Sequence, residues 1–170
     1  KMKLELEMSD VILVIDEGHN LHSRVTDMLS NNLSSIMIKN SIMEAKKFRY
    51  SGMIFWLQEL MRILNEIANF NDEERNREKV IDKDTFVRKV KAVVDYEQFI
   101  SELELAADEI RKKQRKSYLG GIATFLDSWL GENNGYLRYI TEQQSKYGPI
   151  LTLRYSCLDP SLATKDVFSQ

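Results

Sequence analysis

Five consecutive apolar residues, 11–15, lead directly into two adjacent carboxylates, Asp16 and Glu17. Most of the five are β-branched, and an uninterrupted run of this kind is typical of a strand buried on both faces of a parallel α/β sheet. Such sheets bind ligands at the carboxyl ends of their strands. At such an edge Asp16 is placed to hold Mg²⁺, directly or through water, and Glu17 to orient or deprotonate an attacking water.

The order Asp16-Glu17-Gly18-His19 makes this prediction more specific. It resembles the Walker B motif of DEAH-type superfamily 2 helicases, with Gly18 where that family usually has Ala. Both residues are small, and Gly makes the turn more permissive. The alternative is a helical domain in which these four residues occur by chance, because apolar strands that end in Asp-Glu are common.

Composition limits the other possibilities. Of the 170 residues, 43% are hydrophobic and 29% are charged, which is typical of a globular protein with one ordinary domain or two small modules. The formal net charge is −2, so a surface for nucleic acid must be local. No apolar stretch is long enough to span a membrane, so we expect no membrane partner. A single cysteine, Cys157, excludes an internal disulfide and an all-cysteine metal site within this chain.

Apolar spacing predicts helices through most of the first half of the chain. Asn20 can cap a helix over residues 21–29. Residues 33–38 are expected to be extended, with another helix after them. Over residues 52–69 the polar residues form one narrow stripe and the rest are apolar, which predicts a helix packed against at least two neighbours.

The second half begins with residues 71–79, which are almost all polar and predict a solvated loop. Asp82 or Asp84 can cap the helix that follows. The apolar spacing then continues, which predicts either two helices with a break near Asp95 or one bent helix. A further amphipathic helix is expected over residues 118–130.

Strands are predicted again near the end of the chain, over residues 136–143 and 150–157, followed by a helix over residues 160–168. The predicted order is a strand and a helix, then about a hundred residues of helices, and then strands and a final helix. This order suggests a helical module inserted into an α/β domain. Lys1 at one end and a polar Ser169-Gln170 at the other suggest that the chain is a fragment of a larger protein.

Five bases in six positions follow the helical spacing that ends at Ile110: Arg111, Lys112, Lys113, Arg115 and Lys116. The preceding helix carries acids early and bases late, which complements the helix dipole and is a purely structural explanation. The functional explanation is contact with nucleic-acid phosphates. Gly120 and Gly121, close behind, would let the backbone approach a phosphate strand. Both explanations stay open.

A second resemblance lies at the C-terminal end. Residues 150–163 resemble the stretch just before motif III of XPD-family helicases, and their separation from Asp16-Glu17-Gly18-His19 is similar to that family's. In that family a largely helical Arch domain is inserted into the first motor domain between motifs II and III. The resemblance implies a mainly α fold, with an Arch-like insertion at residues 33–148 that contains a few strands. Pieces of a RecA-like α/β helicase domain would flank it at residues 1–32 and 149–170.

The function that this resemblance implies is an ATP-dependent 5′→3′ DNA helicase of the nucleotide-excision-repair type. Carried over by position, Asp16 would serve Mg²⁺, Glu17 would act on the hydrolytic water, and His19 would couple the nucleotide site to the rest of the motor. The implied cofactors are ATP and Mg²⁺. The family also holds a [4Fe–4S] cluster on four cysteines that precede motif II, and these are not in this chain.

The implied partners are single-stranded DNA, the remainder of the helicase chain and repair-complex proteins that dock on the Arch. The location would be cytoplasmic in a prokaryote or nuclear in a eukaryote. Without the phosphate-binding loop and the second motor domain, the isolated chain is expected to be inactive. The alternative function is a helical platform for protein interaction with no catalytic role of its own.

Overall fold

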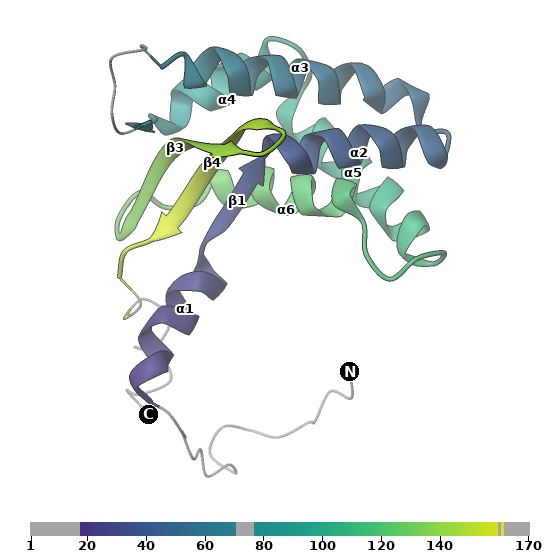
Figure 1. Cartoon of the computed structure of the whole chain (residues 1–170). Helices are drawn as coiled ribbons and strands as arrows, with labels where there is room; N and C mark the ends of the chain where they lie inside the picture. The colour runs from purple at the N-terminus through teal and green to yellow at the C-terminus, as the bar shows by residue number, and fades with distance from the viewer. Residues whose placement is uncertain (1–17, 71–76, 160, 162–170) are drawn as a thin grey trace, which may run out of the picture.

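The computed structural model describes residues 18–70, 77–159 and 161. The described part is mainly helical with a small antiparallel sheet, which confirms the mainly α fold class with a few strands. In Figure 1, helices stack against the sheet while α1 extends away from them. The strand predicted at residues 11–15 and the helix predicted at residues 160–168 lie outside the described residues, apart from Ser161.

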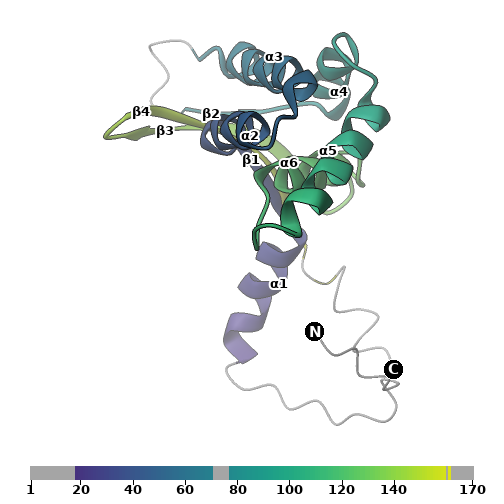
Figure 2. The ribbon, with the colours of Figure 1, turned by 90° about the vertical axis from the view of Figure 1, so that its right-hand side faces the viewer.

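The first described elements are a 3₁₀ turn, η2 (Gly18–Asn20), and the helix α1 (Leu21–Leu29). Helix α1 buries none of its residues and projects from the rest of the described chain in two perpendicular views (Figures 1 and 2). Asn20 has helical backbone angles, and its side chain does not cap the helix. The helix is therefore confirmed and its predicted cap is not.

Strand β1 (Asn31–Ser34) is shorter than the extended segment predicted over residues 33–38. The helix α2 (Ser35–Lys47) begins directly after it. The Ser34 hydroxyl accepts a hydrogen bond from the backbone N–H of Met37 at 3.1 Å, and this cap starts the helix four residues earlier than the apolar pattern suggested. The prediction of extended backbone at residues 35–38 is therefore wrong.

Helix α3 (Ser51–Ala68) matches the prediction for residues 52–69 and buries seven of its side chains. The short strand β2 (Glu78–Val80) was not predicted, because residues 71–79 read as a loop. All three of its residues are exposed, so its sequence carries no apolar alternation. What defines it is pairing with the next strand along the sheet, where Lys79 lies opposite Ile140.

Three helices follow: α4 (Lys83–Lys91), α5 (Tyr96–Arg111) and α6 (Tyr118–Trp129). Asp82 caps α4 by accepting from the Thr85 N–H at 2.9 Å, and Asp95 caps α5 by accepting from the Gln98 N–H at 2.9 Å. The predicted break near Asp95 is thus confirmed, and its physical cause is a new helix cap.

Strands β3 (Tyr136–Ser145) and β4 (Gly148–Cys157) form a hairpin, and the sheet order is β1-β4-β3-β2 with every pair antiparallel. One face of this sheet is covered by helices, with Leu33, Ile140 and Leu153 fully buried. The boundary expected between residues 148 and 149 falls at the start of β4. Because β4 pairs with both β3 and β1, residues 149–157 belong to the same sheet as the helical module.

The chain enters and leaves this sheet at neighbouring points. Asn31, where β1 begins, is paired with Tyr155 near the end of β4. The Cys157 backbone N–H donates to the Ser30 hydroxyl at 2.9 Å. Residues 31–157 therefore form an excursion that returns to its starting point, which is the geometry that insertion into another domain requires.

Arg138, on β3, is a buried charged residue that is only 5% exposed. Its guanidinium donates to the carbonyls of Trp129 (3.0 and 3.2 Å) and Gly131 (2.8 Å) and to the side chain of Asn133 (2.7 Å), and it lies 4.4 Å from the ring of Tyr155. The pKa of Arg138 is lowered from its usual value because the guanidinium is buried, and the nearby Tyr155 offsets part of this effect. These contacts close the C-terminal end of α6, where helix carbonyls have no partners within the helix.

Candidate nucleic-acid interface

Of the three residues expected at the nucleotide site, the structure describes only His19. Asp16 and Glu17 lie outside the described residues. His19 is exposed in the turn η2, and its Nε2 lies 3.1 Å from the side-chain nitrogen of Asn20. This turn continues into α1 and then β1, so the predicted motif is joined to the sheet by one short helix.

Two of the five predicted bases are held by acids on their own helix. Arg111, the last residue of α5, bonds Asp108 at 2.8 Å, and Lys112 bonds Glu109 at 2.5 Å. The hydrogen bond and charge of Glu109 raise the pKa of Lys112. Local ion pairs at the end of the helix therefore account for these two positions.

The other three bases lie in the loop between α5 and α6. Lys113, Arg115 and Lys116 are exposed, and they form no ion pair with any part of the chain that the structure describes. The Lys113 ammonium lies 5.8 Å from the centre of the Phe48 ring, at the end of α2. This contact joins the loop to a chain segment about 65 positions earlier.

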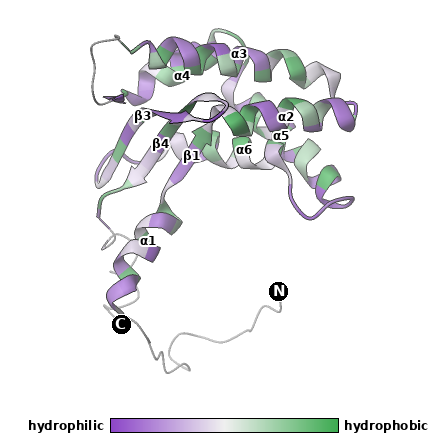
Figure 3. Cartoon of the chain, in the orientation of Figure 1, coloured by the Kyte–Doolittle hydropathy of each residue, from purple (hydrophilic) through white to green (hydrophobic). Residues whose placement is uncertain are grey.

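That earlier segment brings bases of its own. Lys46, Lys47 and Arg49 are exposed at the C-terminal end of α2, and Lys47 lies 5.1 Å from the same Phe48 ring. Figure 3 colours this end of α2 and the α5–α6 loop as hydrophilic. We call the six cations of these two segments the basic surface: Lys46, Lys47, Arg49, Lys113, Arg115 and Lys116.

Sequence reasoning found only half of this surface. Three bases within four positions at the end of a predicted helix were a signal, but helix ends often carry bases for dipole reasons alone. Only the fold shows that the ends of α2 and α5 meet. Because a local concentration of positive charge attracts phosphates even on a chain of net negative charge, the basic surface is the described feature best suited to nucleic acid.

Glu44 links the end of α2 to the α5–α6 loop and the start of α6 through hydrogen bonds. It is buried on α2, and its carboxylate accepts from the Ser117 hydroxyl (2.9 Å), the Leu119 N–H (2.9 Å) and the Gln114 amide (2.7 Å). The first turn of α6 is thereby tied to α2. Both carboxylate oxygens of Glu44 are occupied by these hydrogen bonds.

Replacing Glu44 should therefore destabilise the fold. We expect Glu44→Ala to lower the free energy of unfolding by about 2–3 kcal/mol, because one buried donor and two partly buried donors lose their acceptor. Urea denaturation followed by circular dichroism measures this. The matched control is Glu104→Ala, which removes the same charge from an exposed site on α5 and should change stability by no more than about 0.5 kcal/mol. Equal stability of the two variants would contradict the role of Glu44.

The glycines behind the cluster serve helix packing. Gly120 is buried, and a Cβ placed there would collide with the Arg111 guanidinium and lie 3.1 Å from the Ala107 Cβ. Gly121 faces Met37 of α2, with the added Cβ 3.6 Å from its sulfur. At Gly120 the expectation that the glycines open the backbone to a phosphate strand is wrong, because close contact of α6 with α5 takes up the space, whereas at Gly121 an added Cβ would make only an ordinary contact with α2.

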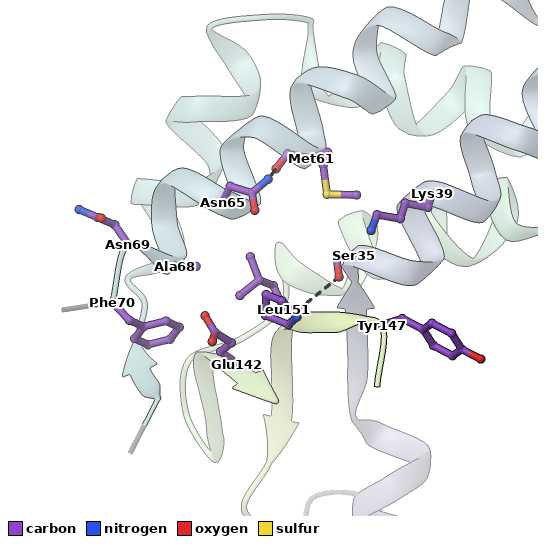
Figure 4. Close-up of a pocket in the computed structure, with 11 residues that line it drawn as sticks. Ser35, Lys39, Met61, Asn65, Ala68, Asn69, Phe70, Glu142, Tyr147 and Leu151 are labelled. Atoms are coloured by element: carbon purple, nitrogen blue, oxygen red, sulfur yellow. Dashed lines mark hydrogen bonds between the residues drawn. The ribbon is translucent and has the colours of Figure 1, made fainter. Parts of the chain in front are cut away.

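A cavity of about 440 Å³ lies between the end of α3 and the β3–β4 hairpin (Figure 4). Several of its polar groups are engaged: Glu142 bonds Arg77 at 2.5 Å, the Ser35 hydroxyl accepts from the Leu151 N–H at 3.3 Å, and the Asn65 amide donates to the Met61 carbonyl at 2.8 Å. Tyr147 points away from the cavity. Among the described residues, Lys39 is the one cation that lines the cavity, and we assign the cavity no site.

Metal chemistry has no support among the described residues, where no three His, Cys, Asp or Glu side chains are grouped to hold an ion. Cys157 is buried, as expected of a small apolar residue, and its thiol donates to the Asp159 carbonyl at 3.3 Å. One cysteine does not fit a four-cysteine cluster, so no iron–sulfur centre is held by this chain alone.

Among the described helices, none combines the length and the apolar character needed to cross a membrane. No known family model matches the chain, and no curated protein shows significant similarity to it.

Proposed function

We propose that this chain is part of an ATP-dependent DNA helicase of the XPD type, in which residues 31–157 act as an Arch-like module that contacts single-stranded DNA. The observation that carries the DNA contact is the basic surface, where cations from two distant segments meet. The helicase assignment rests on the resemblance of Asp16-Glu17-Gly18-His19 and of residues 150–163 to that family.

The path of the chain supports an inserted module. Residues Asn31 and Tyr155 are neighbours in the sheet, so the excursion could be placed between two consecutive segments of a motor domain without separating them. The RecA-like character of the flanking residues 1–30 and 158–170 is part of the proposal.

At the nucleotide site, Asp16 would hold Mg²⁺ and Glu17 would orient the water that attacks ATP. His19 lies at the start of the path from this motif through α1 to β1. A shift at His19 during hydrolysis would then be transmitted to the sheet and to the helices packed on it.

A second candidate, a platform for protein partners, is favoured by the outer face of the sheet. Val80 and Leu158 are exposed there beside a shallow depression of about 540 Å³ that Leu137 and Tyr139 also line. Exposed apolar groups gathered in one place are typical of protein interfaces. This face is separate from the basic surface, so the two functions can be tested apart.

The DNA contact is tested by removing charges from the basic surface. Lys113→Ala combined with Lys116→Ala should weaken binding of single-stranded DNA by this chain for every sequence tried, because phosphate contacts carry no sequence information. The slope of log affinity against log salt should become shallower by roughly 1.4, which is about 0.7 for each of two lost phosphate contacts. Fluorescence anisotropy with two unrelated oligonucleotides across a potassium chloride series measures both effects.

The control variant is Lys91→Ala combined with Lys146→Ala, which removes the same net charge from the end of α4 and the hairpin tip. It should leave the slope near that of the unaltered chain. An equal change of slope in both double variants would mean that only net charge matters, and an unchanged slope in the first would assign its lysines to a protein partner.

A further inference from the structure

A shallow groove of about 310 Å³ opens within the basic surface, between the second half of α2 and the start of α6. Met43, Phe48 and Tyr118 form its apolar walls, and the amides of Asn40 and Gln114 reach it from either side. Lys47 also lines it. It therefore combines flat apolar surface, hydrogen-bonding groups and positive charge.

The apolar walls are open to solvent. Met43 is 69% exposed and Tyr118 is 49% exposed, although both belong to helices that bury other faces in the core. Neither side chain is needed to close the core, since the buried face of α6 is made by residues such as Leu119, Ile122 and Phe125. An exposed aromatic ring beside a thioether offers stacking surface to a planar group.

The positive charges near the groove favour a negatively charged ligand. Lys47 and Lys113 both lie within 6 Å of the Phe48 ring centre, at 5.1 and 5.8 Å. The one acid that lines the groove, Glu44, is buried and accepts three hydrogen bonds from Gln114, Ser117 and Leu119. Both ammonium groups therefore lie near the Phe48 wall of the groove, and a planar ligand that carries negative charge beside its flat part matches this arrangement.

We propose that this groove receives an unstacked base of a single-stranded nucleic acid, with Tyr118 as the stacking residue and the neighbouring phosphates lying near Lys47 and Lys113. This inference rests on the proposed function and adds to it, because it requires bases as well as phosphates. Base stacking on an aromatic ring tolerates any sequence, since every base has a flat π-face. A base paired within a duplex cannot enter, so the groove distinguishes single strands from double strands.

The test compares a thymidine 15-mer with an abasic strand of the same length and charge, using the full 170-residue chain and fluorescence anisotropy at low salt. The unaltered chain should bind the thymidine strand more tightly. Tyr118→Ala should weaken binding of the thymidine strand about tenfold and leave binding of the abasic strand unchanged. Tyr118→Phe keeps the ring and should retain most of the affinity.

Tyr147→Ala is the matched control, because it removes a 92% exposed tyrosine at the hairpin tip and should alter neither measurement. Folding of each variant is checked by circular dichroism. Equal affinity of the unaltered chain for the two strands would overturn the base pocket and leave the basic surface in place as a phosphate site. An acidic peptide of matched charge that competes as well as the thymidine strand would also overturn it, in favour of a protein partner.

Discussion

Arg138→Met should lower the free energy of unfolding by about 2–4 kcal/mol, because the buried Trp129 carbonyl loses its donor and three partly buried acceptors lose one donor each. The acceptors are the carbonyls of Trp129, Gly131 and Glu132 and the side chain of Asn133. Methionine fills a similar volume, so the change measures the lost hydrogen bonds and ring contacts more than a cavity. Denaturation with guanidinium chloride, followed by tryptophan fluorescence, gives the value.

Arg138→Lys separates charge from geometry. Lysine keeps the positive charge but lacks the planar fork that reaches several carbonyls at once, so roughly half of the loss should remain. Arg154→Met is the matched control, since Arg154 lies exposed on the neighbouring strand β4 and its replacement should change stability by about 0.5 kcal/mol or less. Similar losses in Arg138→Met and Arg154→Met would contradict the assignment of Arg138 as the clamp on the end of α6.

The helices of the described chain could be predicted because their apolar spacing is strong. The stretch at residues 52–69 has one narrow polar stripe, and α3 matches it within one residue at each end. The break near Asp95 was also predictable, because a capping residue interrupts the pattern there. The strand pair β3–β4 was found from its β-branched and aromatic residues, although both strands extend further toward the hairpin turn than predicted.

Elements that depend on distant partners could not be predicted in this way. Strand β2 has three exposed residues and exists because it pairs with β3. The start of α2 depends on one hydroxyl, that of Ser34, in a segment whose apolar residues fit a strand equally well. The apolar spacing of a segment predicts its secondary structure only where the competing structure, helix or strand, would leave apolar side chains exposed.

The same limit applies to the candidate site. Glu44 and Arg138 are single polar residues in otherwise ordinary patterns, and nothing in their neighbours along the chain indicates that both are buried. The bases Lys113, Arg115 and Lys116 were recognised from their density. Their counterparts on α2 join them only through a contact across the fold at Phe48, which no spacing rule describes.

The second prediction with a large effect concerns the motif at the start of the chain. In the complete ATPase that the proposed function implies, Glu17→Gln should reduce ATP turnover on the order of 10²–10⁴-fold, the usual contribution of a general base. Nucleotide binding should remain within a few-fold of the unaltered enzyme, because glutamine keeps the size and hydrogen bonding of the side chain while losing the base. Steady-state phosphate release and equilibrium binding of a fluorescent nucleotide measure the two quantities separately.

Asp10→Asn provides the control, since it removes a carboxylate that precedes the predicted strand, where no ligand is expected, and it should leave turnover nearly unchanged. Asp16→Asn should differ from Glu17→Gln by weakening the dependence on Mg²⁺, because a carboxylate that holds the ion is lost rather than the base that acts on water. Near-normal hydrolysis in Glu17→Gln would make the carboxylate pair a structural feature of a strand end. The basic surface would then belong to a binding module without a motor, and the DNA-binding variants would still report on it independently.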